Sequence, residues 1–350
     1  MLKWFEETDT NDPGILCSRL RLMRNWSEYP FPAKLDEAQS RELVERLEMG
    51  LKDIGELDQQ KYDCTFIDEM KELDRKVLRE RKVIHSAIMK KKTPTGLMLS
   101  KREDTGLILG GDDHIRLQLF ARGNVLPALW KQANRYDDYI NERFTYAFDP
   151  KYGFLTAFPT NVGTGLRASV FIHLPALSMG KRFVSAISDM GRFGISVKGL
   201  FGEGRDNFGA LFEVSNQKTL GQTEREIVEL VGKAALQLSK QENEVRLQVL
   251  EKHRAEREDE IYKSYGVLQY ARRMTQKDAL TFLSQILTGE NDGLLKFAEP
   301  CSIFALMLGV QSANLQRLSK APMGKEELEG ARARYLQERL PKLKEAADGE

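Results

Sequence analysis

One apolar stretch of this sequence is interrupted by residues that could do chemistry. The segment LILGGDDHIRLQLF (107–120) breaks at two glycines, after which come Asp112, Asp113, His114 and Arg116. Carboxylates beside an imidazole and a guanidinium are typical of proton transfer and anion binding. The cluster therefore predicts either a turn or a chemical site within strand-like sequence.

Arginines recur in segments that are otherwise apolar or glycine-rich. CSRLRLMRN (17–25) places Arg19 and Arg21 two residues apart, hence on one face if the segment is extended. Arg116 lies in strand-like sequence, and Arg167 follows a glycine-rich turn. Each alone is most often a solvated surface charge, but a buried arginine needs an anionic partner. Because guanidinium groups match phosphate oxygens bidentately, the set predicts a triphosphate site.

Other nucleotide-binding signals are weaker. GTGLRA (163–168) matches the dinucleotide fingerprint G-x-G-x-x-A, with Asp189 near the expected distance downstream. The fingerprint needs a strand leading directly into the glycines, and residues 159–161 intervene, so we disfavour it. The sequence has no P-loop pattern. His173, within apolar VFIHLPAL, is interpreted as a core histidine, whereas His114 either binds nucleotide or hydrogen-bonds within the sheet.

Composition limits the class of protein. The 350 residues include 41% hydrophobic residues, enough for one large domain with an appendage or for two domains. A net charge of +1 gives no basic field for nucleic acid, and no apolar run is long enough to span a membrane. The first residues carry acids where a signal peptide has its apolar core. Three scattered cysteines suggest neither disulfides nor a metal site, so we expect a cytoplasmic protein.

Hydrophobic periodicity predicts strands mixed with helices, followed by helices alone. Thr223 with Glu226 forms a capping box that opens a charged helix to about Tyr262, and Thr275 opens a helix that Gly289 ends. Further helices are expected at residues 38–51, 124–144, 166–179 and 324–343. Strands are expected at residues 62–70, 97–99, 107–109, 152–158, 193–204 and 207–216. We therefore predict an α+β region over 14–245 and an all-helical region over 246–350.

Several blocks of sequence resemble one enzyme family. PTNVGTGLRASVFIHLPAL (159–177) resembles the signature of the ATP:guanido phosphotransferases, the phosphagen kinase family. CSRLRLMRN, GGDDHIRLQ and KGLFGEG resemble segments of its bacterial branch, the protein-arginine kinases. YKSYGVLQYAR and the terminal helix resemble the C-terminal domain of that branch. The similarity covers nearly the whole chain in the same order.

The resemblance implies a fold and a reaction. The fold is an antiparallel sheet flanked by helices, with nucleotide lying across the sheet, followed by a helical C-terminal domain. The reaction moves the γ-phosphoryl group of ATP, with Mg²⁺, to the guanidinium of an arginine side chain in another protein. A guanidinium with a pKa above about 12 is a poor nucleophile, so carboxylates must hold it and take a proton. An arginine cluster on the phosphates suits the charge that phosphoryl transfer develops.

The resemblance also assigns roles to residues. Asp112 falls on the catalytic glutamate, Asp206 on the second substrate carboxylate, and Lys82 on a nucleotide-contacting histidine. Arg19, Arg21, Arg116 and Arg167 match phosphate-binding arginines. Nucleotide-contacting segments match Cys17, Ser18, Arg19, Leu20 and Arg21; Arg167, Ala168, Ser169, Val170 and Phe171; and Lys198, Gly199, Leu200, Phe201, Gly202 and Glu203.

The sequence departs from the family mainly on the acceptor side. Asp112 is one methylene shorter than glutamate, Gly110 and Gly111 replace Asn-Glu, and Phe158 replaces the cysteine whose thiolate lies beside the acceptor. Lys198 and Lys76 replace phosphate-binding arginines, which keeps the charge but loses the bidentate fork. LEGARA (328–333) aligns with the phosphoarginine-binding motif R-D-x-x-R-A, with leucine in place of its first arginine.

Three hypotheses follow for the function. The first is an active protein-arginine kinase in protein quality control or the stress response. The second is an ATP-binding pseudokinase that acts as an adaptor or regulator. The third, a kinase for small guanidino compounds, is disfavoured because the sequence shows no additional N-terminal helical domain. Charge-preserving changes at Asp112, Lys198 and Lys76 favour the first. A zinc-binding activator protein and a homodimer are left open.

Overall fold

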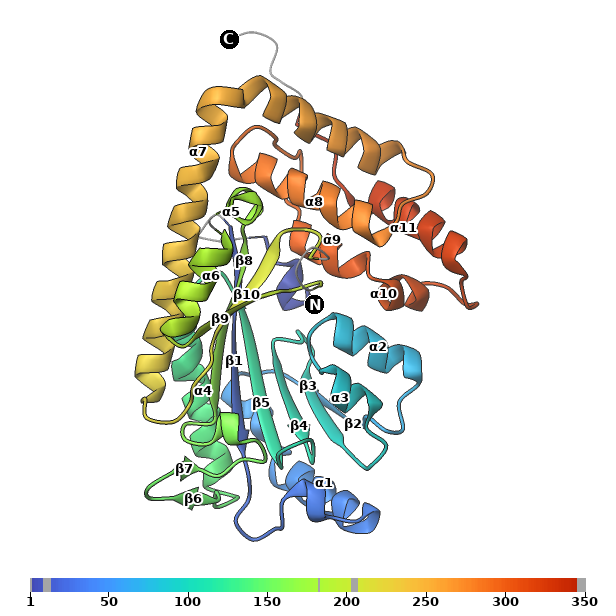
Figure 1. Cartoon of the computed structure of the whole chain (residues 1–350). Coiled ribbons are helices and arrows are strands. Elements are labelled where there is room, and N and C mark those ends of the chain that lie inside the picture. The colour runs from blue at the N-terminus through green and yellow to red at the C-terminus, as the bar shows by residue number, and fades with distance from the viewer. Residues whose placement is uncertain (1, 9–13, 182, 203–206, 345–350) are drawn as a thin grey trace.

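The computed structural model describes residues 2–8, 14–181, 183–202 and 207–344. An eight-stranded antiparallel sheet, in the order β2-β3-β4-β5-β1-β8-β10-β9, forms its centre (Figure 1). The strands are β1 (Ile15–Arg24), β2 (Tyr62–Phe66), β3 (Gly96–Ser100), β4 (Thr105–Leu109), β5 (Ile115–Arg122), β8 (Leu166–His173), β9 (Ile195–Gly199) and β10 (Leu211–Asn216). A separate two-stranded sheet joins β6 (Phe148–Asp149) and β7 (Gly153–Phe154).

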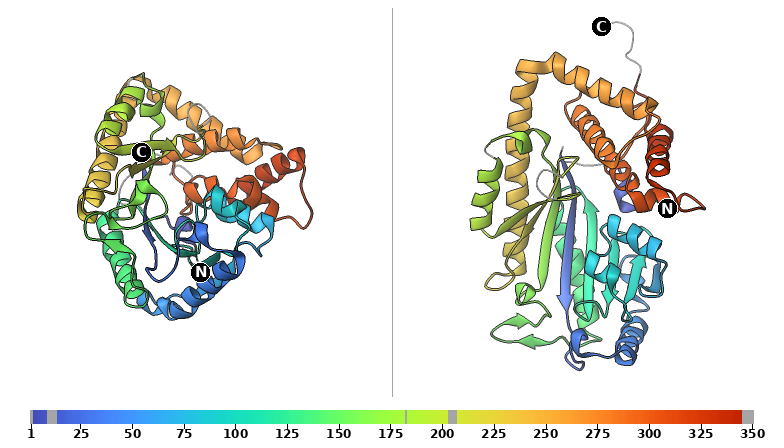
Figure 2. Two further views of the ribbon diagram at one scale, coloured as in Figure 1. Left: turned by 60° about the horizontal axis from the view of Figure 1, so that its bottom comes forward. Right: turned by 45° about the vertical axis from the view of Figure 1, so that its right-hand side comes forward.

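Helices cover the two faces of the sheet differently (Figure 2). One face carries α1 (Glu37–Gly50), α4 (Leu126–Asn141), α6 (Phe183–Arg192) and the first part of α7 (Glu224–Tyr270). On the other face, α2 (Glu72–Glu80) and α3 (Ser86–Lys90) lie over β3 and β4. The remaining helices are α5 (Pro175–Met179), α8 (Gln276–Asn291), α9 (Ile303–Gly309), α10 (Ser312–Arg317) and α11 (Lys325–Arg339).

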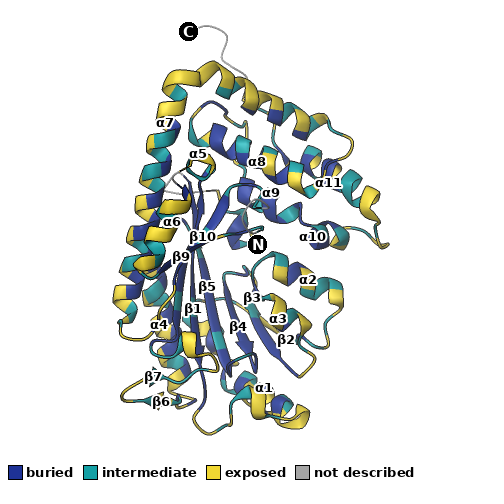
Figure 3. Ribbon diagram, viewed as in Figure 1, coloured by how far each residue is buried: buried dark blue, intermediate teal, exposed yellow. Residues whose placement is uncertain are grey.

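Side chains along the strands alternate between the two faces of the sheet. One face forms the core, and the other carries a band of mostly polar residues that we call the polar strip. One face forms a continuous apolar core from side chains such as Leu20, Leu22, Leu117, Leu119, Ala168, Val170 and Val214. The opposite face has two separate apolar clusters, one under α2 and α3 and one under the C-terminal helices. On this opposite face, the residues of β1, β5, β8, β9 and β10 between the two clusters are polar except for Met23, although the sheet is largely buried there (Figure 3).

Much of the predicted architecture is confirmed. The chain folds as an α+β protein with an antiparallel sheet and a helical C-terminal region. The predicted strand pair at residues 97–109 is the β3–β4 hairpin, and residues 193–216 contain the antiparallel pair β9–β10. Thr223 and Glu226 form the predicted capping box at the start of α7. Within the described ranges, no helix combines the length and apolar character that a membrane crossing requires.

Three local predictions are wrong. Residues 166–179 are not one helix but strand β8 followed by the short helix α5. β8 lies between β1 and β10 and is largely buried. Its side chains alternate between the core face and the opposite face of the sheet, but the apolar run at residues 170–172 hides this period in the sequence. The strand predicted at residues 152–158 shrinks to the two residues of β7. Gly289 does not end α8; it lies inside the helix, where an added Cβ would meet Ile261 at 2.6 Å.

Helix α7 connects the two parts of the chain. It runs for 47 residues, and its backbone departs from helical angles at His253 (φ −137°, ψ 36°). The first part packs on β8 and β10, and the second part packs on α8 and α11. The predicted division at 245/246 falls within this helix, a few residues before the break, and stays a prediction.

Candidate active site

Strand register brings arginines together in the polar strip. Arg21 on β1 is the cross-strand partner of Arg167 on β8, and Arg19 follows on the same face. Met23 of β1 pairs with Arg116 of β5. Like charges directly across a sheet destabilise it unless an anion compensates them. We call Arg19, Arg21, Arg116, Arg167 and Lys198 of β9 the cation cluster.

A partly buried glutamate in the cation cluster was not predicted from the sequence. Glu213 on β10 pairs with Lys198 across the sheet. Its Oε1 accepts hydrogen bonds from the guanidiniums of Arg19 and Arg21 and from the Ser169 hydroxyl at 2.8 Å. Burial raises the pKa of Glu213, but the two arginines outweigh burial and hold it well below its ordinary value. Glu213 is therefore charged, and it keeps the cluster together when no other anion is bound.

One carboxylate does not compensate five cations. Within the described residues, Nε of Arg19 and Nε of Arg21 are buried without a hydrogen-bond partner. Burial, followed by the charge of Arg19, lowers the pKa of Arg116 to about 10, and burial also lowers the pKa of Arg21 and of Arg167. Because these guanidiniums are held charged in a poorly solvated place, the cluster is built for a polyanion.

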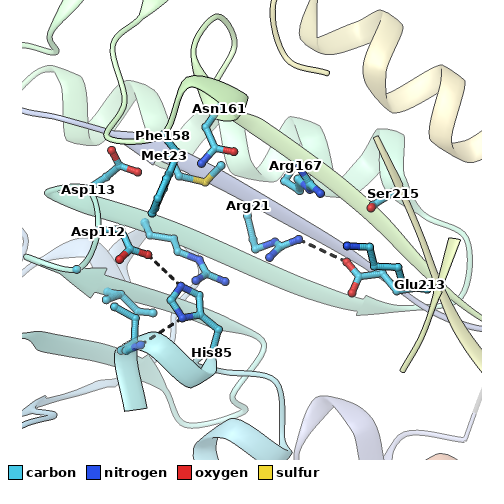
Figure 4. Close-up of a pocket in the computed structure, with 15 residues that line it drawn as sticks. Arg21, Met23, His85, Asp112, Asp113, Phe158, Asn161, Arg167, Glu213 and Ser215 are labelled. Carbon is cyan, nitrogen blue, oxygen red and sulfur yellow. Dashed lines mark hydrogen bonds and ion pairs between the residues drawn. The ribbon is translucent and has the colours of Figure 1, made fainter. Parts of the chain in front are cut away.

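Two adjoining cavities open on the cation cluster. The first, of about 310 Å³, lies beside the β4–β5 hairpin, and we call it the hairpin cavity (Figure 4). The second, of about 450 Å³, lies between the sheet and the C-terminal helices, and we call it the interlobe cavity. Both are lined by Arg21, His85, Arg116 and Glu213, so a ligand on the cluster can reach from one cavity to the other.

The β4–β5 hairpin loop, residues 110–114, has a conformation that depends on glycine. Gly110 is in the left-handed region (φ +65°), which favours glycine and tolerates asparagine, the residue of the family. At Gly111 an added Cβ would lie 3.0 Å from Ile108 and 3.2 Å from Ile88, which leaves little room for a side chain. Lys91 Nζ donates to the carbonyl oxygens of Gly110 (2.6 Å) and Gly111 (2.7 Å) and holds the loop in place.

Two polar residues of the loop, Asp113 and His114, form hydrogen bonds that hold the fold together. Asp113 Oδ1 accepts hydrogen bonds from Asn25 Nδ2 (2.7 Å) and from the backbone N–H of Ala157 (2.6 Å). His114 is fully buried: its Nδ1 accepts from the N–H of Trp26 (2.9 Å), and its Nε2 lies 2.8 Å from the carbonyl oxygen of Pro30. The second reading of His114, a hydrogen-bonding role within the fold, is therefore correct.

Asp112 faces the hairpin cavity. Its Oδ2 lies 3.0 Å from Nε2 of His85, a residue to which the sequence assigned no role. The hydrogen bond from His85 lowers the pKa of Asp112, and the charges of Arg116 and Lys91 lower it further. Asp112 is thus an ionised carboxylate beside the cation cluster, suited to hold a cationic group and to accept a proton from it.

Phe158 forms another wall of the hairpin cavity. It directly precedes the 3₁₀ turn Pro159–Asn161, and its side chain is 51% exposed. Figure 4 shows its ring pointing into the cavity on the side of Asp112. The Asp113–Ala157 hydrogen bond ties the segment before Phe158 to the hairpin loop. Backbone groups here bond to side chains, which is why the predicted strand does not form.

The interlobe cavity contains the lysine predicted to contact nucleotide. Lys82 adopts a left-handed backbone (φ +64°), and its Nζ donates to the carbonyl oxygen of Leu200 (2.8 Å) near the Phe201 ring. Burial lowers the pKa of Lys82 to about 8. Gln276 of α8 and Gln311, the residue before α10, supply the wall from the C-terminal region.

A carboxylate fastens α10 beside this cavity. Glu80, at the end of α2, accepts hydrogen bonds from the backbone N–H groups of Ala313 and Asn314, both at 2.9 Å. These are unpaired donors of the first turn of α10, where a negative charge is favourable. The C-terminal region is therefore bonded directly to α2, a helix that borders the interlobe cavity.

The remaining predicted site residues divide into four groups. Leu200 and Phe201 line the interlobe cavity beside the end of β9, where Gly199 and Gly202 lie. Cys17 and Phe171 are on the cation-cluster face but buried in the apolar cluster under the C-terminal helices. The side chains of Ser18, Leu20, Ala168 and Val170 lie on the opposite, core face. Glu203 and Asp206 lie outside the described residues.

The structure also places two other features of the sequence, Lys76 and the segment GTGLRA. Lys76 is exposed on α2, where it pairs with Glu72 at 2.6 Å, away from both cavities. GTGLRA leads into strand β8 rather than a helix, so it is not a dinucleotide fingerprint. The described residues contain no group of three or more His, Cys, Asp or Glu residues placed to hold a metal ion.

Two family models match the chain. Residues 42–245 match the ATP:guanido phosphotransferase C-terminal catalytic domain, and residues 254–350 match the protein-arginine kinase McsB C-terminal domain. The chain belongs to the ATP:guanido phosphotransferase family. The matched residues include β5, β8, β9 and β10, which carry much of the cation cluster.

Relatives within the family match over nearly their full length. The protein-arginine kinase of Halothermothrix orenii is 33% identical over 93% of this chain and 93% of that protein. The protein-arginine kinase of Halalkalibacterium halodurans is 34% identical over 96% of this chain and 94% of that protein. The bacterial branch recognised in the sequence is confirmed.

Solved structures of guanido kinases share the fold. A lombricine kinase aligns with a TM-score of 0.58 at 20% identity over 72% of each chain. The duplicated taurocyamine kinase from Schistosoma mansoni, with bound transition state analog components, aligns with a TM-score of 0.59 at 21% identity over 80% of this chain and 41% of that one.

The segment that aligns with the family's phosphoarginine motif is part of the packing of the C-terminal region. Arg332 on α11 is buried, and its guanidinium donates to the carbonyl oxygens of Val310 and Met274, both at 2.9 Å. Leu328, where the motif has its first arginine, is partly exposed one turn earlier. A guanidinium occupied in this way holds α11 against the loops before α8 and α10.

Proposed function

We propose that this chain is a protein-arginine kinase that transfers the γ-phosphoryl group of ATP to the guanidinium of arginine side chains in other proteins. The observation that carries the proposal is that the cation cluster lies next to Asp112. The cluster is open to the hairpin cavity, which contains Asp112, and to the interlobe cavity. Membership of the guanido phosphotransferase family, together with relatives named protein-arginine kinase, supports the same reaction.

The cation cluster is proposed to bind the phosphates of ATP. Arg21, Arg116 and Arg167 line the hairpin cavity and can stabilise the charge of the transferring group, while Arg19 and Lys82 face the interlobe cavity. The base and ribose would then extend between Phe201 and the glutamines of the C-terminal region. We propose Mg²⁺ as the divalent ion, which would neutralise phosphate charge when bound.

Asp112 is proposed to hold and deprotonate the acceptor. The acceptor guanidinium enters the hairpin cavity between Asp112 and Phe158, where the carboxylate pairs with it and the aromatic ring can face it. A nitrogen–phosphorus bond forms as the phosphorus–oxygen bond to ADP breaks, and the guanidinium proton passes to the carboxylate of Asp112. Asp206 is proposed as the second carboxylate from the resemblance alone.

The wider biological setting is also part of the proposal. We propose a cytoplasmic kinase in protein quality control or the stress response, whose partners are proteins with exposed arginines. We retain 14–245 as the catalytic region and 246–350 as the helical region, with α7 shared by both. A zinc-binding activator and a homodimer stay open.

The test is direct detection of the product. The purified chain is incubated with MgATP and an arginine-rich protein, and phosphoarginine, which is acid-labile, is detected by mass spectrometry at neutral pH. The Asp112→Asn variant is the matched control and should form phosphoarginine about 10²- to 10³-fold more slowly. Measurable ATP binding with no phosphoarginine from the unmodified chain would favour the adaptor hypothesis instead.

A further inference from the structure

The histidine beside Asp112 has a defined orientation. His85 is the N-cap of α3, and its Nδ1 accepts a hydrogen bond from the backbone N–H of Ile88 at 3.2 Å. An imidazole nitrogen that accepts has no proton, so in the neutral ring the proton is on Nε2. Nε2 is the atom that lies 3.0 Å from Asp112 Oδ2. The fold therefore makes His85 a donor to Asp112.

We propose that His85 is a positioning residue that fixes the Asp112 carboxylate for the acceptor guanidinium. This inference rests on the proposed function and deepens it. With Oδ2 bound to His85, the other oxygen, Oδ1, is the one available to the acceptor in the hairpin cavity (Figure 4). His85 keeps its proton throughout, while the proton of the acceptor goes to Asp112.

The short side chain of Asp112 gives this contact its importance. Aspartate reaches one methylene less far than the glutamate of the family, and a misplacement of about 1 Å can lower a rate roughly 10²-fold. The backbone of the loop is already fixed by Lys91 and Asp113. The imidazole of His85 fixes the side chain as well, so that the shorter carboxylate is held in one orientation.

Other charges act on Asp112 but do not replace the hydrogen bond. Arg116 on β5 and Lys91 after α3 lower its pKa, while Asp113 is the adjacent acid. Arg21, Arg167, Lys198 and Glu213 line the same cavity from the strands opposite. Within the described residues, His85 is the side chain that bonds directly to the Asp112 carboxylate. Replacing His85 should therefore raise the pKa of Asp112, but Asp112 should stay ionised at neutral pH.

Two substitutions separate the bond to Asp112 from the helix cap. His85→Asn keeps an N-cap acceptor for Ile88 but is too short to reach Asp112, whereas His85→Gln can place an N–H donor near the position of Nε2. We expect His85→Asn to lower kcat about 10- to 100-fold with an unchanged Kd for ATP, and to move the acid limb of the kcat profile to higher pH. His85→Gln should recover most of the activity.

The length of the acid at position 112 gives a second test. In the unmodified chain, Asp112→Glu should lower kcat, because the longer side chain meets the imidazole. Combined with His85→Asn, the same change should raise kcat above that of His85→Asn alone. His253→Ala, an exposed histidine on α7, is the control and should leave kcat unchanged. Full activity and an unaltered pH profile in His85→Asn would overturn the proposal.

A spectroscopic measurement keeps the test independent of turnover. The ¹⁵N shifts of His85 should report a neutral ring protonated on Nε2, and the Nε2 signal should move in Asp112→Asn. If the unmodified chain binds ATP but makes no phosphoarginine, the proposed function fails, while the shifts still decide whether the pair exists. If the shifts show a proton on Nδ1, the positioning role fails even in an active kinase.

Discussion

The two sides of the candidate active site are built in different ways. The phosphate side is made of side chains on five adjacent strands, where register fixes each position. The acceptor side is made of a hairpin loop, a helix N-cap and the segment before a 3₁₀ turn. The first keeps the charges of the family, and the second is where the sequence has changed.

A site built on strands and a site built on loops differ in how readily their residues can be substituted. A residue in a central strand has neighbours on both sides, so replacing Arg21 disturbs its contacts with Glu213 and its position opposite Arg167. A loop residue can change if a nearby segment compensates for it. The shorter acid at Asp112 occurs together with an imidazole from α3, and Phe158 supplies an aromatic wall in place of a thiolate.

The largest effect is expected on the phosphate side. Arg116→Ala removes a cation from the point where both cavities meet, so kcat/KM should fall about 10³-fold or more. Arg116→Lys keeps the charge but not the fork and should recover only part of this loss. Steady-state kinetics gives the answer, with Arg192→Ala on the exposed surface of α6 as control. A loss below tenfold would mean that the cluster does not stabilise the transferring group.

The next effect tests the acid of the hairpin loop. Asp112→Asn keeps the size of the side chain but removes its charge and basicity, so kcat should fall about 10²- to 10³-fold. Calorimetry should give an unchanged Kd for ATP, because Asp112 lies on the acceptor side. Asp63→Asn on the edge strand β2 is the matched control. Retention of full activity would exclude Asp112 as the base.

A pH effect should separate the nucleotide side from the acceptor side. Lys82 has a pKa of about 8, so it is charged below that pH and becomes neutral above it. Phosphates prefer the charged form, and the Kd for ATP should therefore rise about 3- to 10-fold between about pH 7 and about pH 9. Lys82→Arg should remove this dependence, because arginine stays protonated. The same pH dependence in Lys82→Arg would assign it to another group.

The smallest effect is expected at the aromatic wall. Phe158→Ala removes a half-exposed ring that can face the acceptor guanidinium, so KM for a protein substrate should rise about 2- to 5-fold while kcat changes little. Tyr152→Ala, another exposed aromatic, serves as control. If kcat falls instead of KM rising, Phe158 helps to position the reacting group rather than to bind it.

The sequence predicted the residues of the phosphate side better than those of the acceptor side. A charged residue within an apolar, strand-like segment can be recognised from the sequence alone, and this signal identified Arg19, Arg21 and Arg116. The same signal was present at Glu213, which lies between the core-facing residues Phe212 and Val214 of β10. It could have been found by asking which carboxylate balances the arginines.

His85 could not be found in this way. It lies 27 residues before Asp112, directly ahead of a short helix that has no clear periodicity of its own, and only the packing of α3 over β4 brings the two together. The error at residues 166–179 has a related cause. The apolar run at residues 170–172 of β8 fits a helix as well as a strand, and the neighbours β1 and β10 that make it a strand are distant in sequence.

The contact between Glu80 and the start of α10 has a thermodynamic consequence. Gln311, the residue just before α10, lines the interlobe cavity, so the helical region and a bound nucleotide share one wall. When two ligands bind to sites that share a structural element, any effect of one on the affinity for the other is reciprocal. A molecule that changes the affinity for nucleotide through α10 must therefore have its own affinity changed by nucleotide by the same factor.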